Sequence, residues 1–219
     1  MNIIYKAYCI TNALFTKTLN YVMEKKSPLE YNDTQRMNNN RQTIVHTLYH
    51  FTYPMTRITP RIYLGNAYNS RDYYALKHAN VGLIINCTTE FPNYFPDEFD
   101  YVQVPVQDIP NESLVPYFQT ITGKMHTFLR DNPEKSIFIH CFMGASRSVS
   151  FLIAYFVRYH NMTVDETIEK ISALRPFINL NVDFYFQLVE YHMSLNTELV
   201  FDDDSHDDTS AVRDDNPRA

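Results

Sequence analysis

The segment from His140 to Ser148, HCFMGASRS, combines residue types that can bind and attack a phosphate group. Cys141 opens a loop that Arg147 closes, in the pattern C-x5-R. Backbone amides of the intervening residues can surround one tetrahedral oxyanion, while the guanidinium binds two of its oxygens in parallel. The same positive field stabilises a thiolate, the nucleophilic form of cysteine. The pattern therefore predicts a cysteine nucleophile aimed at phosphorus.

The C-x5-R spacing alone is a weak signal, because such a pair readily arises by chance. Its neighbours make it specific: His140 precedes the cysteine, Gly144 permits a tight backbone turn, and serines flank Arg147 on both sides. A cysteine that merely packs at a strand-to-helix junction does not explain this combination. We interpret the segment as a phosphate-binding loop.

The elements around this loop predict an α/β fold with a central, mainly parallel sheet flanked by helices, because strands alternate with helices. Strands are expected at 58–64, 81–87, 101–104 and 136–140, and helices at 70–78, 114–130, 147–160, 163–174 and 182–195. Thr163 followed by Glu166 predicts a capping box, and Pro176 ends the helix before it. The loop then lies between a strand and an apolar helix, where α/β proteins bind ligands and a helix N-terminus attracts anions.

Two flanking regions differ from this body, which we expect to form a catalytic domain over 56–197. Apolar residues at helical spacing predict an extra amphipathic helix within residues 1–23, followed by a polar linker and lead-in at 24–55. The helix packs on its own domain or, because the linker acts as a tether, contacts a second copy to form a homodimer. Residues 198–219 are expected to form an acidic disordered tail.

The formal net charge of −6 is unevenly distributed. Residues 202–219 hold seven Asp and two Arg (−5), residues 1–55 six basic and three acidic groups (+3), and residues 56–201 eleven basic and fifteen acidic groups (−4). An acidic body argues against a nucleic-acid partner, because the nucleic-acid backbone requires a basic face. It does not argue against a single phosphate, for which one arginine, a helix terminus and a ring of amides suffice.

The three cysteines, Cys9, Cys87 and Cys141, are too few and too scattered for a disulfide scaffold. No secretion signal is evident, and the longest strictly apolar run, 151–157, is far shorter than the roughly 20 residues of a membrane span. We therefore expect a chain without a membrane span in a reducing compartment, cytoplasmic or nuclear.

The loop and the helix after it, HCFMGASRSVSFLIAYFV, resemble those of the cysteine-dependent dual-specificity protein phosphatases, in the protein tyrosine phosphatase superfamily. The resemblance covers 56–195. ITPRIYLGNAYNSRDYYAL is similar to the family's opening strand and helix, VGLIINCTTEFPN to its next strand and loop, VPVQDIPNESLVPYF to its acid loop, and LRPFINLNVDFYFQL to its closing helix. The resemblance implies a compact domain with a largely parallel sheet, and a reaction that needs no cofactor or metal.

The resemblance also implies roles. Cys141 takes the phosphoryl group, and Arg147 with the loop amides stabilises the transition state. His140 supports the loop, and Ser148 helps the thiolate leave. The general acid corresponds to Asp108, which alone falls where VPVQD matches. The rival carboxylates are Asp97, Glu98, Asp100 and Glu112.

The favoured substrates are proteins bearing phosphotyrosine and phosphoserine or phosphothreonine, hydrolysed through a phosphocysteine intermediate. The loop residues expected to contact the phosphate are Phe142, Met143, Gly144, Ala145, Ser146 and Arg147. Uncharged side chains in the loop disfavour phosphoinositides, and Ser146-Arg147-Ser148 replaces the Asn-Arg-Thr usual in RNA 5′-phosphatases. A catalytically weak phosphoprotein-binding module is the other alternative, against which the retained nucleophile, arginine and acid argue.

The chain departs from the family's pattern at three positions. Met143 stands where Ala is common, Leu180 where Pro is usual, and Asp183 where Gly is common. The last two touch the closing helix, so Asn181 is left out of the expected catalytic set.

Cys87 has two interpretations. It is a small buried hydrophobe or, as in some relatives, forms a reversible disulfide with Cys141 that protects the nucleophile from oxidation. His46 and His50 have helical spacing that suits a metal, but no third ligand is evident, and packing explains them.

Overall fold

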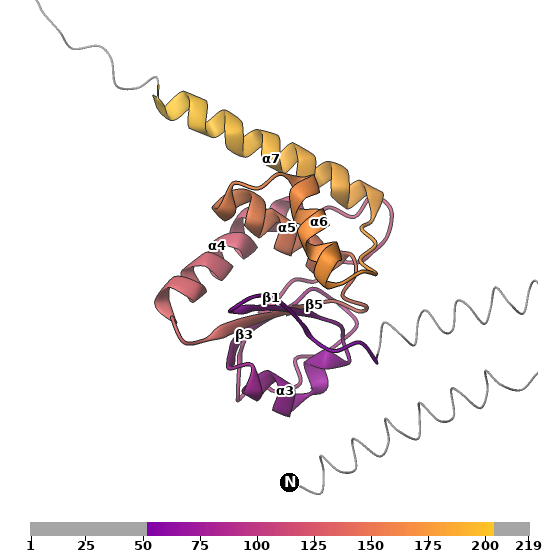
Figure 1. Cartoon of the computed structure of the whole chain (residues 1–219). Coiled ribbons are helices and arrows are strands. Elements are labelled where there is room, and N and C mark those ends of the chain that lie inside the picture. The colour runs from indigo at the N-terminus through magenta and orange to yellow at the C-terminus, as the bar shows by residue number, and fades with distance from the viewer. Residues whose placement is uncertain (1–51, 204–219) are drawn as a thin grey trace, which may run out of the picture. The chain divides into compact units, whose positions relative to one another are not determined.

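The structure, a computed structural model, describes residues 52–203 (Figure 1). The predicted N-terminal helix, nearly all of the linker, His46 and His50, and the acidic tail beyond residue 203 lie outside this range.

A five-stranded sheet forms the centre of the described domain, in the order β1-β2-β5-β3-β4. Strands β2, β5, β3 and β4 run parallel, and only β1 is antiparallel to its neighbour. The strands span Thr56–Thr59 (β1), Ile62–Gly65 (β2), Val81–Asn86 (β3), Asp100–Gln103 (β4) and Ser136–His140 (β5). The predicted α/β class and mainly parallel sheet are confirmed.

One predicted strand was wrong in detail. Residues 58–64 do not form a single strand but a tight hairpin, in which Thr59 of β1 pairs with Ile62 of β2. Pro60 lies at the turn, where its fixed φ and missing N–H are tolerated. The apolar pattern predicted extended backbone correctly but could not show that the chain reverses.

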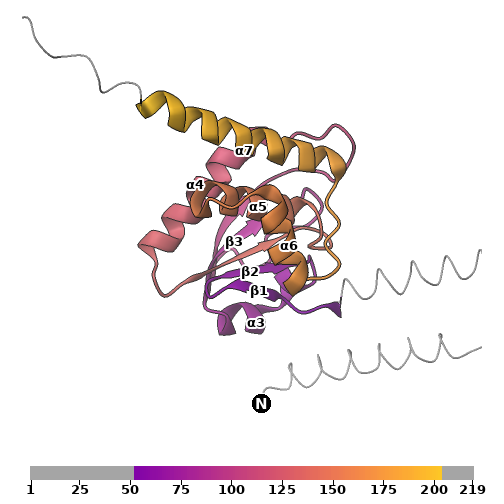
Figure 2. The same cartoon turned by 45° about the horizontal axis from the view of Figure 1, so that its top comes forward.

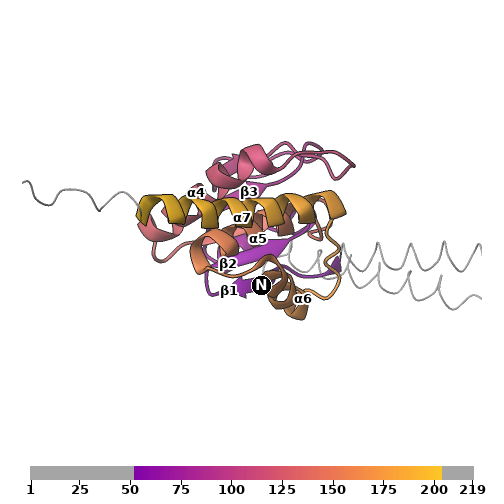
Figure 3. The same ribbon diagram turned by 90° about the horizontal axis from the view of Figure 1, so that it is seen from above.

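Helices cover both faces of the sheet. The helices are α3 (Tyr73–His78), which follows the short 3-10 turn η1 (Asn69–Arg71), then α4 (Val115–Asp131), α5 (Arg147–His160), α6 (Val164–Leu174) and α7 (Val182–Asp203). Figures 1 and 2 show α3 on one face and α4 to α7 on the other, and Figure 3 shows α7 lying across the helical layer. Helix α7 is longer than the predicted 182–195.

The core explains why β5 sits at the centre. All five of its residues are buried: Ile137 and Ile139 pack toward α5, and Phe138 joins the smaller apolar cluster on the α3 side. Successive side chains of a strand point to opposite faces, so a strand covered on both sides is apolar throughout. The end of β5 is thereby fixed, and the phosphate-binding loop follows it directly.

Local signals set the helix ends. Thr163 and Glu166 form the predicted capping box at the start of α6, and α5 ends at Asn161 in the left-handed conformation (φ 52°). Among the described residues, no helix is both long enough and apolar enough to cross a membrane.

Candidate active site

The phosphate-binding loop, residues 141–146, connects the end of β5 to the first turn of α5. Cys141 is only 2% exposed, and its Sγ accepts hydrogen bonds from the Gly144 amide at 3.3 Å and from the Ser148 hydroxyl at 3.3 Å. Both donors stabilise negative charge on sulfur. The structure therefore brings the predicted nucleophile and Ser148 together at the N-terminus of a helix.

Arg175, which the sequence analysis did not single out, holds the outer side of this loop. It is fully buried; its Nε donates to the Gly144 carbonyl at 2.9 Å and its Nη2 to the Met143 carbonyl at 3.2 Å. In a trans peptide the C=O and the next N–H point in opposite directions. Fixing these carbonyls outward therefore turns the amides of Gly144 and Ala145 inward.

Gly144 is required at its position by both conformation and space. Its φ is +68°, and a Cβ built there would lie 2.3 Å from the Gly65 carbonyl oxygen. The loop thus packs directly on the end of β2, and only glycine permits this approach.

Arg147 reaches from α5 under two neighbouring loops. It is 4% exposed, and its Nη1 donates to the Val106 carbonyl at 3.0 Å and to the Glu90 carboxylate at 3.0 Å. Its Nε is buried and has no hydrogen-bond partner. Buried donors normally have a hydrogen-bond partner. A guanidinium N–H without one, next to the inward-facing amides of the phosphate-binding loop (the oxyanion cradle), is suited to bind an oxyanion.

Glu90 is a functional residue that the sequence analysis missed. Although burial raises the pKa of its carboxyl, hydrogen bonding to Arg147 and to backbone amides outweighs this and lowers it below its ordinary value. Two fully buried side chains build its loop: Thr88 donates to Asn86 at 2.7 Å, and Asn86 donates to the Phe91 carbonyl at 3.0 Å. The available signal was that Glu90 is the first carboxylate after β3, the neighbour of β5.

His140 lies buried at the end of β5, with its ring stacked on Phe138 at 5.4 Å and its Nδ1 3.4 Å from the Cys141 carbonyl. Burial, reinforced by the charge of Arg147, lowers its pKa to about 4. The ring is therefore neutral at pH 7 and adjoins the nucleophile's backbone. This placement suits the predicted supporting role.

Asp108 lies exposed on the acid loop, residues 105–114, between β4 and α4. Asn181 holds it: the Asn181 amide group donates to the Asp108 carboxylate at 3.2 Å, and the Asn181 backbone N–H donates to the Ser146 hydroxyl at 3.2 Å. One side chain and its own backbone thus join the acid loop to the phosphate-binding loop. Asn181 was left out of the expected catalytic set, so this role was not predicted.

The start of α7 fastens the rest of the acid loop. The Asp183 carboxylate accepts from the Asn111 amide at 3.0 Å, and Gln187 accepts from the Leu114 amide at 2.7 Å. Asn111 has a positive φ of 64°, which a loop tolerates when contacts hold it. Asp183, a departure from the family's pattern, is therefore part of the acid loop's support.

Three of the four carboxylates that rivalled Asp108 lie elsewhere. Asp97, Glu98 and Asp100 border a hollow with Val81 and Gly82, at the start of β3 and therefore at the opposite end of the sheet from Cys141. Glu98 is paired with Lys77 at 2.7 Å. Only Glu112 shares the acid loop with Asp108.

The expected substrate-contacting residues surround Cys141 as a group. Gly144, Ala145 and Ser146 are buried in the loop, whereas Phe142 is 36% exposed and stacks on Phe91 at 5.6 Å. Phe142 therefore lies at the edge of the site, whereas the buried loop residues lie around the nucleophile.

Cys87 is fully buried at the end of β3, and its amide donates to the His140 carbonyl at 2.9 Å, which places it beside Cys141. Both cysteines are free. Burial, with the neighbouring Cys141, raises the pKa of the Cys87 thiol well above its ordinary value. Packing as a small hydrophobe accounts for this, and a redox partnership with Cys141 stays a prediction.

Comparison with known proteins agrees with this geometry. Residues 62–194 match the family described as dual specificity phosphatase, catalytic domain. The chain belongs to this family. It is 33% identical to dual specificity protein phosphatase 14 of Mus musculus over 141 residues, covering 64% of this chain and 70% of that one. It is 31% identical to dual specificity protein phosphatase 21 of Homo sapiens over 143 residues, covering 65% and 74%.

Solved structures show the same fold. A crystal structure of a mouse putative dual specificity phosphatase, complexed with zinc tungstate, superposes with a TM-score of 0.63 at 26% identity, covering 67% of this chain and 91% of that one. The predicted family, fold and phosphatase class are confirmed. The chain is a phosphatase of the dual-specificity class.

Proposed function

We propose that this phosphatase hydrolyses phosphotyrosine and phosphoserine or phosphothreonine on proteins through a phosphocysteine intermediate. One observation carries the proposal: Cys141 Sγ lies within a ring of inward donors, next to an arginine whose Nε has no partner. The tungstate in the mouse relative's crystal structure is, like phosphate, a tetrahedral oxyanion.

In the first step Cys141 Sγ attacks phosphorus, an S–P bond forms, and the ester O–P bond breaks. Asp108 gives its proton to the departing oxygen, because a good leaving group is the neutral alcohol or phenol. Arg147 and the amides of Gly144 and Ala145 bind the equatorial oxygens, where charge is spread in the transition state.

In the second step water attacks phosphorus, Asp108 takes the water's proton, and the S–P bond breaks to release inorganic phosphate. The Ser148 hydroxyl, 3.3 Å from Sγ, donates to the thiolate as it leaves. Asp108 thus acts first as an acid and then as a base, for which an exposed carboxyl held at the rim is suited.

Turnover of p-nitrophenyl phosphate and phosphopeptides tests the proposal. We expect Cys141→Ser to lower kcat by at least about 10⁴-fold and Asp108→Asn by about 10²-fold. Asp97→Asn, at the opposite end of the sheet, is the matched control and should retain full activity. Acid quenching during turnover should trap one phosphate on Cys141, detectable by mass spectrometry.

A wild-type chain that binds phosphopeptides without turning over any phosphate ester would refute hydrolysis and establish the binding module instead. Turnover of RNA 5′-phosphates or phosphoinositides in preference to phosphopeptides would refute the substrate class.

A further inference from the structure

Four loops border the opening above Cys141. They comprise residues 87–93, 105–114, 141–146 and 176–183, the last of which includes the first two residues of α7. Arg147 contacts the first through Glu90 and the second through Val106. Asn181, in the fourth, bonds both Asp108 and Ser146. These hydrogen bonds make the four loops one continuous rim around the nucleophile.

The rim is acidic. None of its four loops contains a Lys, Arg or His, and their charged residues are Glu90, Asp108, Glu112 and Asp183. The two arginines that adjoin these loops, Arg147 and Arg175, are 4% and 0% exposed. Arg147 is paired with Glu90, so the uncompensated carboxylates are Asp108, Glu112 and Asp183.

The segment after β2 also adjoins the rim, because the Ala67 amide donates to the Phe142 carbonyl at 3.0 Å. It adds one exposed arginine, Arg71, which lies over the Tyr94 ring, and the carboxylate of Asp72. Its charges cancel, so the excess of carboxylates at the rim remains.

The same rim carries exposed apolar side chains. Phe142 is 36% exposed, Ile109 46% and Val182 61%, and Tyr68, next to Ala67, is 40% exposed. Ile109 directly follows the general acid, and Val182 directly follows Asn181. Large apolar side chains exposed together around a site mark a contact surface for a bound partner.

We propose that this rim selects phosphoprotein segments in which basic and apolar residues flank the phosphorylated residue; the inference rests on the proposed function. An excess of carboxylates attracts cationic flanks and repels acidic ones. Apolar residues beside the phosphate lose water-exposed surface against Ile109 and Val182. The phosphate itself is neutralised below the rim by Arg147 and the loop amides.

Phosphotyrosine peptides of equal length test this, with Lys, Ser or Glu at the flanking positions and either Leu or Ser beside the phosphotyrosine. At low ionic strength we expect kcat/KM to be about 10-fold higher for the Lys peptide than for the Glu peptide, with the ratio falling as salt screens the charges. Replacing Leu by Ser should lower kcat/KM about threefold, because apolar burial is lost.

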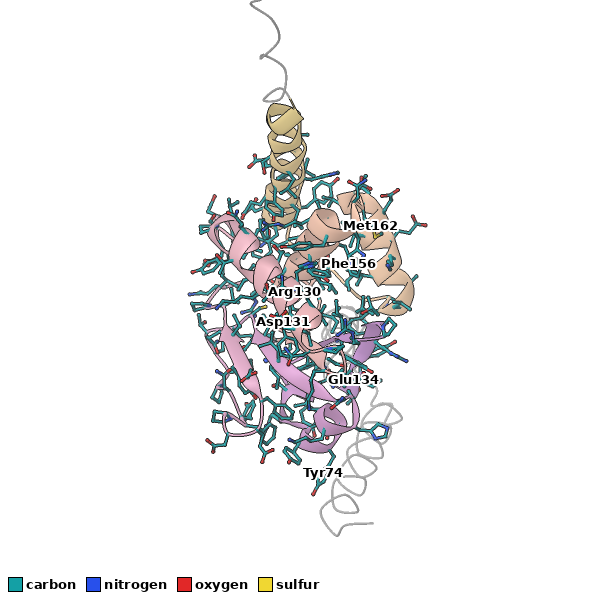
Figure 4. The ribbon with its side chains drawn as sticks, turned by 90° about the vertical axis from the view of Figure 1, so that its left-hand side faces the viewer. Tyr74, Arg130, Asp131, Glu134, Phe156 and Met162 are labelled. Atoms are coloured by element: carbon teal, nitrogen blue, oxygen red, sulfur yellow. The ribbon has the colours of Figure 1, made fainter. Side chains whose placement is uncertain are left out.

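Two variants locate the effect. Glu112→Lys and Asp183→Asn should each reduce the ratio of kcat/KM for the Lys peptide to kcat/KM for the Glu peptide about two- to threefold. Asp183→Asn keeps a side-chain oxygen that accepts from the Asn111 amide. Glu134→Lys is the matched control. Glu134, labelled in Figure 4, lies in the turn before β5, whereas Cys141 follows the other end of that strand. The control makes the same change in net charge as Glu112→Lys and should leave the ratio unchanged.

The ratio compares two peptides on one enzyme, so any change in the chemical step cancels. An equal or greater preference for the Glu peptide, or the same shift with Glu134→Lys, would overturn the proposed selectivity. Such a result with normal turnover of p-nitrophenyl phosphate contradicts only the rim's role, whereas loss of all turnover contradicts the proposed function itself.

Discussion

The phosphate-binding loop and the acid loop serve the same reaction but are held in different ways. The first is mostly buried, packed on the backbone of β2 at Gly144, and fixed from outside by the fully buried Arg175. The second is mostly exposed; Asn181 holds it at Asp108, and side chains from the start of α7 hold it at Asn111 and Leu114. The loop that binds the oxyanion is therefore part of the packed core, whereas the loop that carries the proton donor lies on the surface and is held there by side-chain hydrogen bonds.

This division follows from the chemistry that each loop performs. A cradle of amides stabilises a transition state only if its donors are already oriented, so its position must not fluctuate. The acid must meet different leaving groups and then a water, so it lies at the rim, where substrate and solvent reach it. Breaking the two loops should therefore produce different defects.

Among changes that disturb how the loops are held and leave the reacting groups in place, the largest defect is expected from Gly144→Ala. The added Cβ would lie 2.3 Å from the Gly65 carbonyl oxygen at a φ of +68°, so the loop must move. We expect kcat to fall about 100-fold and the free energy of unfolding to fall by about 3 kcal/mol. Turnover assays and urea denaturation measure the two.

Gly123→Ala is the matched control, since it makes the same change inside α4, where the nearest atom is the Tyr159 hydroxyl at 4.0 Å. It should retain full activity and gain about 0.5–1 kcal/mol of stability. Equal losses from both substitutions would show that the cradle has no special constraint.

A smaller effect is expected from pH, acting through His140 beneath the cradle. Its pKa is about 4 in the folded chain and near 6.5 when unfolded, so the unfolded chain binds the proton first as pH falls. Its contribution to stability is therefore complete above about pH 6.5 and should shrink by about 2 kcal/mol between pH 8 and pH 5.

Urea denaturation at several pH values checks this, with His140→Gln as the comparison. The variant should lose about 2 kcal/mol less than the wild type over this range, because the remaining titrating groups are common to both. Parallel curves for the two proteins would mean that His140 is not buried in its neutral form.

The smallest effect is expected from a change at Asn181, whose side chain bonds Asp108 and Ile109 of the acid loop and also accepts from the Asp183 amide at the start of α7. Asn181→Ala removes the hydrogen bond to the Asp108 carboxylate, and we expect kcat to fall about 10-fold for substrates whose leaving group needs a proton. The loss should grow across aryl phosphates as the pKa of the leaving phenol rises. A purely structural defect would lower all of them equally.

Tyr185→Phe, on the helix that follows Asn181, is the matched control, because it removes only the hydroxyl that donates to Asp165 of α6. Its turnover should match the wild type across the series. The same leaving-group trend in both variants would assign the effect to α7 as a whole rather than to Asn181.

Much of the site was predictable because its signals are local. Cys141, Gly144 and Arg147 lie within seven consecutive residues, and the strand and helix on either side have apolar patterns of their own. The hairpin at Pro60 was not predicted, because the same apolar pattern suits one strand or two.

The supporting residues were missed for a different reason. Glu90 lies 57 residues from Arg147 in the sequence, Arg175 lies 31 from Gly144, and Asn181 lies 73 from Asp108. Nothing in a local pattern distinguishes these side chains from solvated ones, since each acquires its role only by meeting its partner.

The amino-acid sequence by itself determined the chemistry of this protein, because a phosphate cradle, its nucleophile and its arginine can be encoded in one short turn between a strand and a helix. Only the tertiary structure decided how that turn is held and what surrounds it. The order of the strands brings the ends of β2, β3 and β5 together, and their loops converge there with the start of α7. The orientation of Arg147, the support of Asp108 and the acidic, apolar rim all depend on that convergence, since it joins segments distant in the chain.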